Sequence, residues 1–158
     1  ARLFGRAAEQ GDRNALFNLG KLHFEGKGVP KDVPKALANY RQAAELDHIL
    51  ALNTLGALYR GGGKNAEDRG QAKAYFERSA ALGNAVGLFE MARITLEEGT
   101  DPAHQIDAHM YLNLASARAH PNAARALQDL TAAMARSDVE LAQGKARAFV
   151  AVPDAGAR

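Results

Sequence analysis

Residues 15–44 read ALFNLGKLHFEGKGVPKDVPKALANYRQAA, and one interval of 36 residues later, residues 51–80 read ALNTLGALYRGGGKNAEDRGQAKAYFERSA. Small and bulky apolar residues fall at matching places in the two stretches, and the same interval continues through the chain. The matching columns are Ala15, Ala51, Gly87 and Ala123; Leu19, Leu55, Met91 and Leu127; Ala36, Ala72 and Ala108; Tyr40, Phe76 and Leu112; and Ala44, Ala80 and Ser116. A fixed period between about 20 and 50 residues is typical of repeat arrays. Such arrays present extended binding surfaces rather than closed clefts.

Each period predicts a helical hairpin. Between Asn14 and Glu25, apolar residues recur three and four positions apart, as one face of a helix requires. Gly26 and Gly28 are expected to end this helix, because glycine relaxes the backbone where a chain turns. Asp32 is the predicted N-cap of a second helix that runs to about Leu46, with Pro34 in its first turn.

The next two periods repeat this pattern with different turns. We expect a helix over about 50–60, a break at Gly61-Gly62-Gly63, and a second helix that ends at Gly83 and has Asp68 in the column of the N-cap Asp32. The third period breaks at residues 98–102, and its second helix follows.

A fourth helix pair is predicted to begin near Pro121 and to turn at Arg136-Ser137. Ser137 and Glu140 have the S-x-x-E spacing of a capping box. Val152-Pro153 should end the last helix. No segment has the alternating period of a strand, so the sequence predicts an all-α fold, an α/α solenoid that forms a right-handed superhelix of antiparallel helix pairs.

The period also predicts how the chain is organised. We expect the second helix of a truncated repeat over 1–13, repeats over 14–49 and 50–85, a divergent repeat over 86–121, a C-terminal capping helix pair over 122–152 and a flexible tail over 153–158. Leu3 and Phe4 occupy columns that pack against a first helix elsewhere. We therefore expect either a further hairpin upstream or a second copy against this end; a short first helix that acts as its own cap is the alternative.

Composition sets wide limits. The 158 residues are 47% hydrophobic and carry a formal charge of only +2, which gives no basic footprint for nucleic acid. The absence of cysteine excludes disulfides, thiolate metal sites and a cysteine nucleophile. No run of 18 apolar residues indicates a membrane span. The compartment, periplasmic or cytoplasmic, stays open.

The pattern from Ala15 to Ala44, with its G-x-G-V-x-x-D turn at 26–32, resembles the Sel-1-like repeat, a relative of the tetratricopeptide repeat. The resemblance covers most of residues 1–121. It implies an α-solenoid that serves as an adaptor or scaffold for other proteins, often in bacterial envelope or signalling assemblies, with no catalytic role and no cofactor. The chain departs from the family at Thr95, where an aromatic is usual, at Asp47, where glycine is usual, and in lacking the paired cysteines of the secreted branch.

Catalytic patterns are weak. Gly61-Gly62-Gly63-Lys64 lacks the spacing of a P-loop, is followed by Asn65 rather than Ser or Thr, and comes after a predicted helix instead of a strand. The five histidines show no metal-ligand spacing; His104 and His109 are five residues apart and diverge on a helix. The sequence therefore predicts neither an enzyme nor a metal site.

A binding groove is the sharper prediction. In a tetratricopeptide-like hairpin the first helix of each repeat lines the concave face, and the positions left to face it combine aromatic and cationic side chains. These positions are Phe17, Lys21, Phe24, Asn53, Arg60, Phe89, Arg93 and Arg125. Aromatic rings bury area and guanidinium groups pair with carboxylates, so we expect a peptide partner with acidic and apolar residues. Packing of the three phenylalanines against neighbouring hairpins, and self-association through the N-terminal end, are the alternatives.

Overall fold

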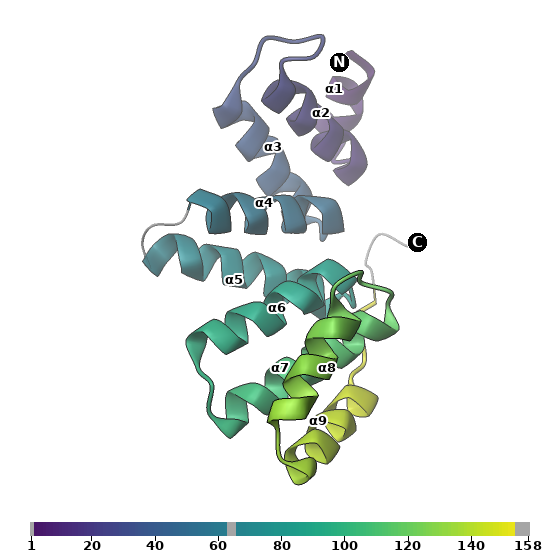
Figure 1. Cartoon of the computed structure of the whole chain (residues 1–158). Helices are drawn as coiled ribbons and strands as arrows, with labels where there is room; N and C mark the ends of the chain where they lie inside the picture. The colour runs from purple at the N-terminus through teal and green to yellow at the C-terminus, as the bar shows by residue number, and fades with distance from the viewer. Residues whose placement is uncertain (1, 63–65, 154–158) are drawn as a thin grey trace. The chain divides into compact units, whose positions relative to one another are not determined.

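The computed structural model describes residues 2–62 and 66–153. Within these ranges it contains nine helices and no strand, so the predicted all-α repeat fold is confirmed (Figure 1). The helices are α1 (Arg2–Glu9), α2 (Arg13–Glu25), α3 (Val33–Glu45), α4 (Ile49–Gly62), α5 (Ala66–Ala81), α6 (Ala85–Glu98), α7 (Pro102–Ala117), α8 (Ala123–Ala133) and α9 (Arg136–Ala148). The chain forms two compact units: the first ends at Tyr75 and the second is Phe76–Pro153, so that the boundary falls inside α5.

In the first unit, α1 packs on α2, α2 on α3 and α3 on α4. Its core holds Tyr40 and Leu55, which are both buried, as are the alanines of the repeat columns around them. Gly20 lies directly against the ring of Tyr40: a Cβ at this glycine would stand 2.8 Å from Cδ1 and Cε1 of the tyrosine. The alternation of small and bulky residues along the columns therefore sets how closely consecutive helices approach.

In the second unit, α7 is the central helix and packs on α6, α8 and α9. Two buried clusters form its core, one around Phe76 and Leu88 and the other around Leu112. The closest helix approach is at Gly87 of α6, where a Cβ would stand 2.6 Å from both the backbone nitrogen of Ala80 and Oγ of Ser79. Only glycine fits this position without movement of the α5 backbone.

The turns between successive repeats share one conformation. Gly11, Asp47, Gly83 and Ala119, each 36 residues apart, all have a left-handed backbone with φ between 55° and 79°. At Asp47 the turn is closed by two bonds: the Asp47 amide donates to the Ala44 carbonyl at 3.0 Å, and the next amide, of His48, to the Ala43 carbonyl at 3.0 Å. Equivalent pairs of bonds close the other three turns. This is the Schellman pattern that ends helices at a left-handed residue.

Asp32 caps α3 as the sequence predicts, and Asp101, which lies in the predicted break at 98–102, caps α7. The Asp32 carboxylate accepts from the Lys35 amide at 3.0 Å, and Asp101 accepts from Ala103 at 3.0 Å. Gly26 has φ 71° and ends α2 as expected.

Two predictions in the second repeat are wrong. Gly61 and Gly62 do not break the helix, because α4 continues through Gly62; glycine costs only about 1 kcal/mol in a helix and both residues lie exposed in its last turn. Asp68 is not an N-cap, because α5 begins at Ala66 and places Asp68 in its first turn, where a carboxylate still interacts favourably with the helix dipole. The rest of the glycine run and its lysine, 63–65, lies outside the described residues.

Two predictions at the last helix are also wrong. The N-cap of α9 is Ala135, so Ser137 lies inside the first turn and its hydroxyl contacts the Asp138 carboxylate, while Glu140 pairs with Arg136 at 3.0 Å. The S-x-x-E spacing therefore forms no capping box. The helix ends at Ala148 rather than at Val152, because Phe149 has an extended backbone.

The close approach at Gly87 gives a prediction on stability. Gly87→Ala should lower the free energy of unfolding by about 1–3 kcal/mol, because the new methyl group overpacks a backbone contact. Gly70→Ala is the matched control: Gly70 is exposed within α5 with no described atom within 4 Å of its Cβ position, and the change should raise stability by about 0.5–1 kcal/mol. Urea denaturation measures both, and equal effects of the two substitutions would contradict this account of the contact.

Candidate interaction surfaces

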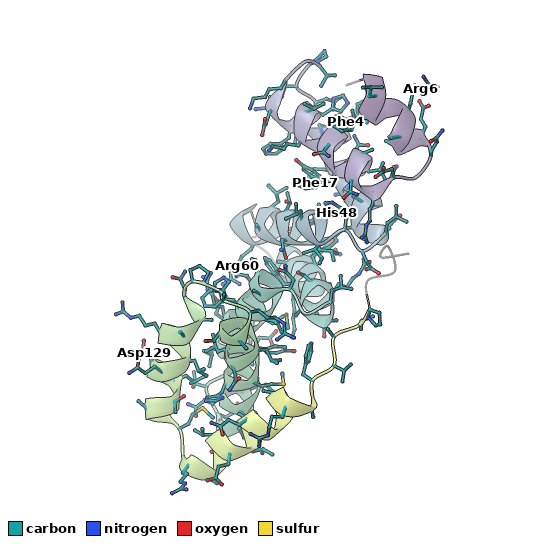
Figure 2. All side chains as sticks on the ribbon, turned by 90° about the vertical axis from the view of Figure 1, so that its right-hand side faces the viewer. Phe4, Arg6, Phe17, His48, Arg60 and Asp129 are labelled. Atoms are coloured by element: carbon teal, nitrogen blue, oxygen red, sulfur yellow. The ribbon has the colours of Figure 1, made fainter. Side chains whose placement is uncertain are left out.

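In the first unit, an aromatic ring of α2 rests on the residue that caps α4. Phe17 stacks on His48 with ring centroids 4.7 Å apart, and lies 5.4 Å from Tyr40 (Figure 2). His48 Nδ1 accepts from the Ala51 amide at 3.2 Å, which is the bond of an N-cap side chain. Because Nδ1 is the acceptor, Nε2 carries the hydrogen and donates to Asn14 Oδ1 at 3.1 Å. Phe17 is thus half-buried, and its ring holds the cap of the next repeat.

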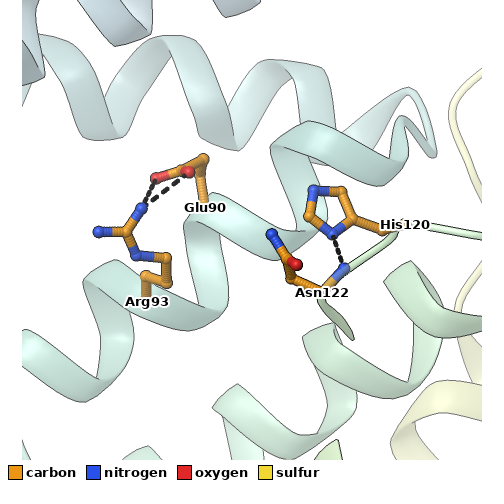
Figure 3. A network of polar contacts seen from close by, with 4 residues as sticks. All are labelled: Glu90, Arg93, His120 and Asn122. Atoms are coloured by element: carbon orange, nitrogen blue, oxygen red, sulfur yellow. Dashed lines mark hydrogen bonds and ion pairs between the residues drawn. The ribbon is translucent and has the colours of Figure 1, made fainter. Parts of the chain in front are cut away.

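The second unit repeats this arrangement two periods later. Phe89 of α6 stacks on His120 with ring centroids 4.1 Å apart. Figure 3 shows the bond that His120 makes just before α8, where its Nδ1 accepts from the Asn122 amide at 3.4 Å. Phe89 also packs against both core clusters of the unit. Burial lowers the pKa of His120, while the nearby Glu90 carboxylate acts in the opposite direction.

The predicted cations of the second unit lie on α6 and α8. Nη1 of Arg93 contacts Glu90 Oε1 at 3.1 Å, and Figure 3 shows this pair together with His120 and Asn122. The Glu90 side chain is only 16% exposed and that of Arg93 is 49% exposed. Arg125 is exposed on α8, in the repeat position that Phe89 has on α6.

The other predicted site residues lie in the first unit. Lys21 is exposed on α2, and Phe24 near its end is 36% exposed. Asn53 and Arg60 are half-buried on α4, and both make polar contacts. The eight predicted residues are thus divided, five in the first unit and three in the second.

The histidine stacks were missed by the sequence reasoning, although their signal was present. Phe17 and Phe89 are two periods apart, and so are His48 and His120. A second missed cluster lies on three consecutive helices of the first unit: Arg41 Nη2 donates to the Tyr59 hydroxyl at 3.0 Å, and Tyr59 stacks on Tyr75 at 5.8 Å. The hydrogen bond to Tyr59 raises the pKa of Arg41.

Two further histidines lie beside polar side chains of the second unit. Burial lowers the pKa of His109, and its Nε2 lies 3.0 Å from Thr131 Oγ1. His104 pairs with Asp101, the N-cap of α7, and this contact lowers the pKa of Asp101. In residues 2–62 and 66–153, no three His, Cys, Asp or Glu side chains are grouped as metal ligands. Nor is any helix in these ranges long and apolar enough to cross a membrane.

The lowered pKa of His120 predicts a pH dependence of stability. Below the ordinary pKa of 6.5, the unfolded chain binds the proton before the folded chain does. The contribution of neutral His120 to the free energy of unfolding is therefore complete above about pH 6.5 and declines as the pH falls toward the pKa of the folded state. Urea denaturation at pH 7.5 and pH 5.0 should show a smaller loss for His120→Asn than for wild type, since asparagine caps α6 at the equivalent position 84. A loss of the same size in both proteins would show that His120 does not contribute.

The chain is similar to Sel1 repeat proteins in sequence and in fold. The Sel1 repeat model matches residues 1–12, 13–48 and 49–84. A Sel1 repeat protein from Oxalobacter formigenes has a solved structure that is 25% identical, with a TM-score of 0.71 over 80% of this chain and 95% of that one. The protective antigen c5321 of uropathogenic Escherichia coli, with an SLR fold, is 18% identical, with a TM-score of 0.54 over 92% of this chain and 39% of that one.

Two curated relatives match shorter stretches of this chain. The alginate biosynthesis protein AlgK of Pseudomonas syringae is 28% identical over 70% of this chain, and the HRD3A component of an ERAD-associated E3 ubiquitin-protein ligase from Arabidopsis thaliana is 30% identical over 49%. The chain spans only 27% and 11% of the lengths of these two relatives. Sel1 repeat proteins are commonly scaffolds that bind other proteins and are generally non-catalytic. With repeats matched over just over half of its length, this chain belongs to the Sel1 repeat family.

Proposed function

We propose that this chain is a non-catalytic adaptor that holds a protein or peptide against the first helices of its repeats. The observation that carries the proposal is the surface formed in the second unit by Phe89, Glu90, Arg93, His120 and Asn122, which we call the α6 patch. It combines a stacked aromatic pair with a half-exposed guanidinium. Tyrosine, tryptophan and arginine anchors beside desolvated contacts are the usual centre of protein interfaces.

The charge on the α6 patch favours a carboxylate-bearing partner. Glu90 contacts Arg93 through Nη1. A guanidinium has five N–H donors in a planar fork, so the ion pair with Glu90 orients the group and leaves donors for a second carboxylate. Arg125 adds an exposed cation on α8. Apolar partner residues would then cover the exposed part of the Phe89–His120 stack.

The first unit offers a similar combination. Lys21 is exposed, and Phe24 is more exposed than Phe17, the other predicted phenylalanine of this unit. Phe17 is stacked on His48 and would contribute an edge rather than a free ring. We propose that acidic and apolar partner residues bind here in the same way, with Asn53 and Arg60 of α4 as further polar contacts.

The relatives support this kind of role. HRD3A is named as a component of a ubiquitin ligase, that is, of a multi-protein assembly, and AlgK as a protein of alginate biosynthesis. Because this chain spans a small part of each, the particular assembly is not transferred. The shared element is the repeat.

Charge reversal on exposed residues tests the proposal without disturbing the core. Arg93→Glu together with Arg125→Glu should reduce capture of a partner from a lysate of the source organism by about tenfold or more, because two repulsive contacts replace two attractive ones. Arg147→Glu, an exposed arginine on α9 outside the patch, is the control with the same kind of charge change and should retain capture. Quantitative mass spectrometry measures the captured protein. Equal capture by all three proteins would contradict the proposal.

Self-association is the second candidate function, favoured by α1. Phe4 belongs to the column of Tyr40, Phe76 and Leu112, yet it is 39% exposed where those residues are 4%, 2% and 2% exposed. The neighbouring Leu3 is 83% exposed. An apolar α1 face of this kind is suited to dock on another copy.

Light scattering at two protein concentrations separates the two functions. If α1 mediates self-association, the weight-average mass should rise with concentration, and Phe4→Asp should return it to that of the monomer. A constant monomeric mass in wild type would exclude self-association in this chain, whereas the adaptor role would stand.

A further inference from the structure

The chain after α9 binds back onto the second unit as an extended peptide. Phe149 packs against the core cluster around Phe76 and lies under the guanidinium of Arg118, with Cζ 5.7 Å from the ring centroid. Two residues on, Ala151 lies against Gly83, where a Cβ on the glycine would be 3.0 Å from that of the alanine. The Val152 amide then donates to the Ala81 carbonyl at 2.8 Å. Figure 1 shows this segment, residues 149–152, in yellow after α9.

The seat of this segment is formed by two successive inter-repeat turns. Gly83 is the left-handed residue of one turn, and Arg118 directly precedes the left-handed Ala119 of the next. The absence of a side chain at position 83 also lets Ala151 approach closely, since a Cβ there would be in tight contact with the alanine. The segment therefore packs on a repeat turn at the place where its left-handed residue is a glycine, Gly83.

The first unit has the same pair of turns two periods earlier, and a cavity lies between them. Gly83 corresponds to Gly11 and Arg118 to Leu46, and both of these residues line the cavity, which has a volume of about 510 Å³. A Cβ at Gly11 would meet no described atom within 4 Å, and Leu46 is 44% exposed. Among the four inter-repeat turns, only those at Gly11 and Gly83 have glycine at the left-handed position.

We propose that this cavity, between the turns at 11–14 and 45–47, docks a segment of a partner protein that resembles residues 147–153 of this chain and is extended from its phenylalanine onward. The segment presents a phenylalanine to Leu46 and a small residue over Gly11. Leu46 replaces Arg118, so the contact with the phenylalanine ring is apolar here rather than a cation–π contact.

Charge favours a basic residue beside the phenylalanine. The cavity is lined by Asp12, Glu45 and Asp47 but by a single base, Arg13, whose Nη1 donates to the Leu46 carbonyl at 3.2 Å. An excess of acidic groups around the rim attracts a cation on the docked segment. The peptide Arg-Ala-Phe-Val-Ala-Val-Pro, residues 147–153, has an arginine two positions before its phenylalanine and so meets this requirement.

This site is separate from the helix faces of the proposed function, because it lies on the turns at one end of the helices. Neither proposal depends on the other: the α6 patch and the cavity share no residue. Failure of the charge reversals at Arg93 and Arg125 would therefore leave the turn site standing, and the converse also holds.

The experiment titrates the full ¹⁵N-labelled chain with the acetylated and amidated peptide 147–153. Amide shifts should concentrate at 11–14 and 45–47, with a dissociation constant of about 100 µM, because a free peptide lacks the effective concentration that the tethered segment has in the second unit. A peptide of the same composition in scrambled order is the control. Shifts confined to 81–84 and 118, or no shifts at about 1 mM peptide, would overturn the proposal.

Three substitutions sharpen the test. Leu46→Asp should weaken binding about tenfold, since the ring would meet a charge in place of an apolar side chain. Leu50→Asp changes a comparably exposed leucine that does not line the cavity and should leave binding unchanged. Leu46→Arg recreates the residue found at 118 and should restore binding. Binding by Leu46→Asp as tight as wild type, with its fold verified by circular dichroism, would overturn the proposal.

Discussion

Close contact between consecutive helices is the constraint on which the rest of this structure depends. At Gly87 the α6 backbone approaches α5 so closely that a single methyl group would meet Ala80 and Ser79, and at Gly20 the α2 backbone lies against the Tyr40 ring. Helices held this near to each other expose little of their facing sides. Phe17 and Phe89 pack toward the neighbouring repeat, where each ring stacks on a histidine, His48 or His120.

Because of these stacks, a residue of the proposed binding surface also contributes to the stability of the fold. The ring of Phe89 contacts both core clusters and stacks on His120, so one side chain belongs to the core and to the proposed patch. A partner that covers this ring also shields the cap from water. We infer that binding at the patch and protection of the α8 start are coupled, although the contacts themselves are local.

Much of the fold could be predicted from the sequence because it depends on local chemistry repeated at a fixed interval. The cap Asp32, the turn at Gly26 and the break before Pro102 each depend on residues only a few positions away. Ser137 and Glu140 were misread because their spacing does not say where the helix begins, and the start at Ala135 depends on how α9 packs on α7. The docked segment at 149–152 could not be predicted, since its partners lie at Ala81, Gly83 and Arg118. The phenylalanines and histidines of the two stacks occupy matching repeat positions in the sequence. The sequence does not show that they are in contact, because the contact forms between one repeat and the next.

The two kinds of turn differ in how freely their length can change. The chain connects α2 to α3 through residues 26–32, whereas it connects α6 to α7 through only 99–101. The shorter connection is offset by a longer helix, since α7 has 16 residues and α3 has 13. The turns between repeats at 10–12, 46–48 and 82–84 have one length, and the turn at 118–122 is longer although it is closed around the same kind of left-handed residue. A longer connection inside a hairpin is therefore offset by a shorter second helix, and the left-handed residues at the repeat borders keep their spacing. The tip of a hairpin can in this way differ in shape from one repeat to the next while the stacking of the helices is kept.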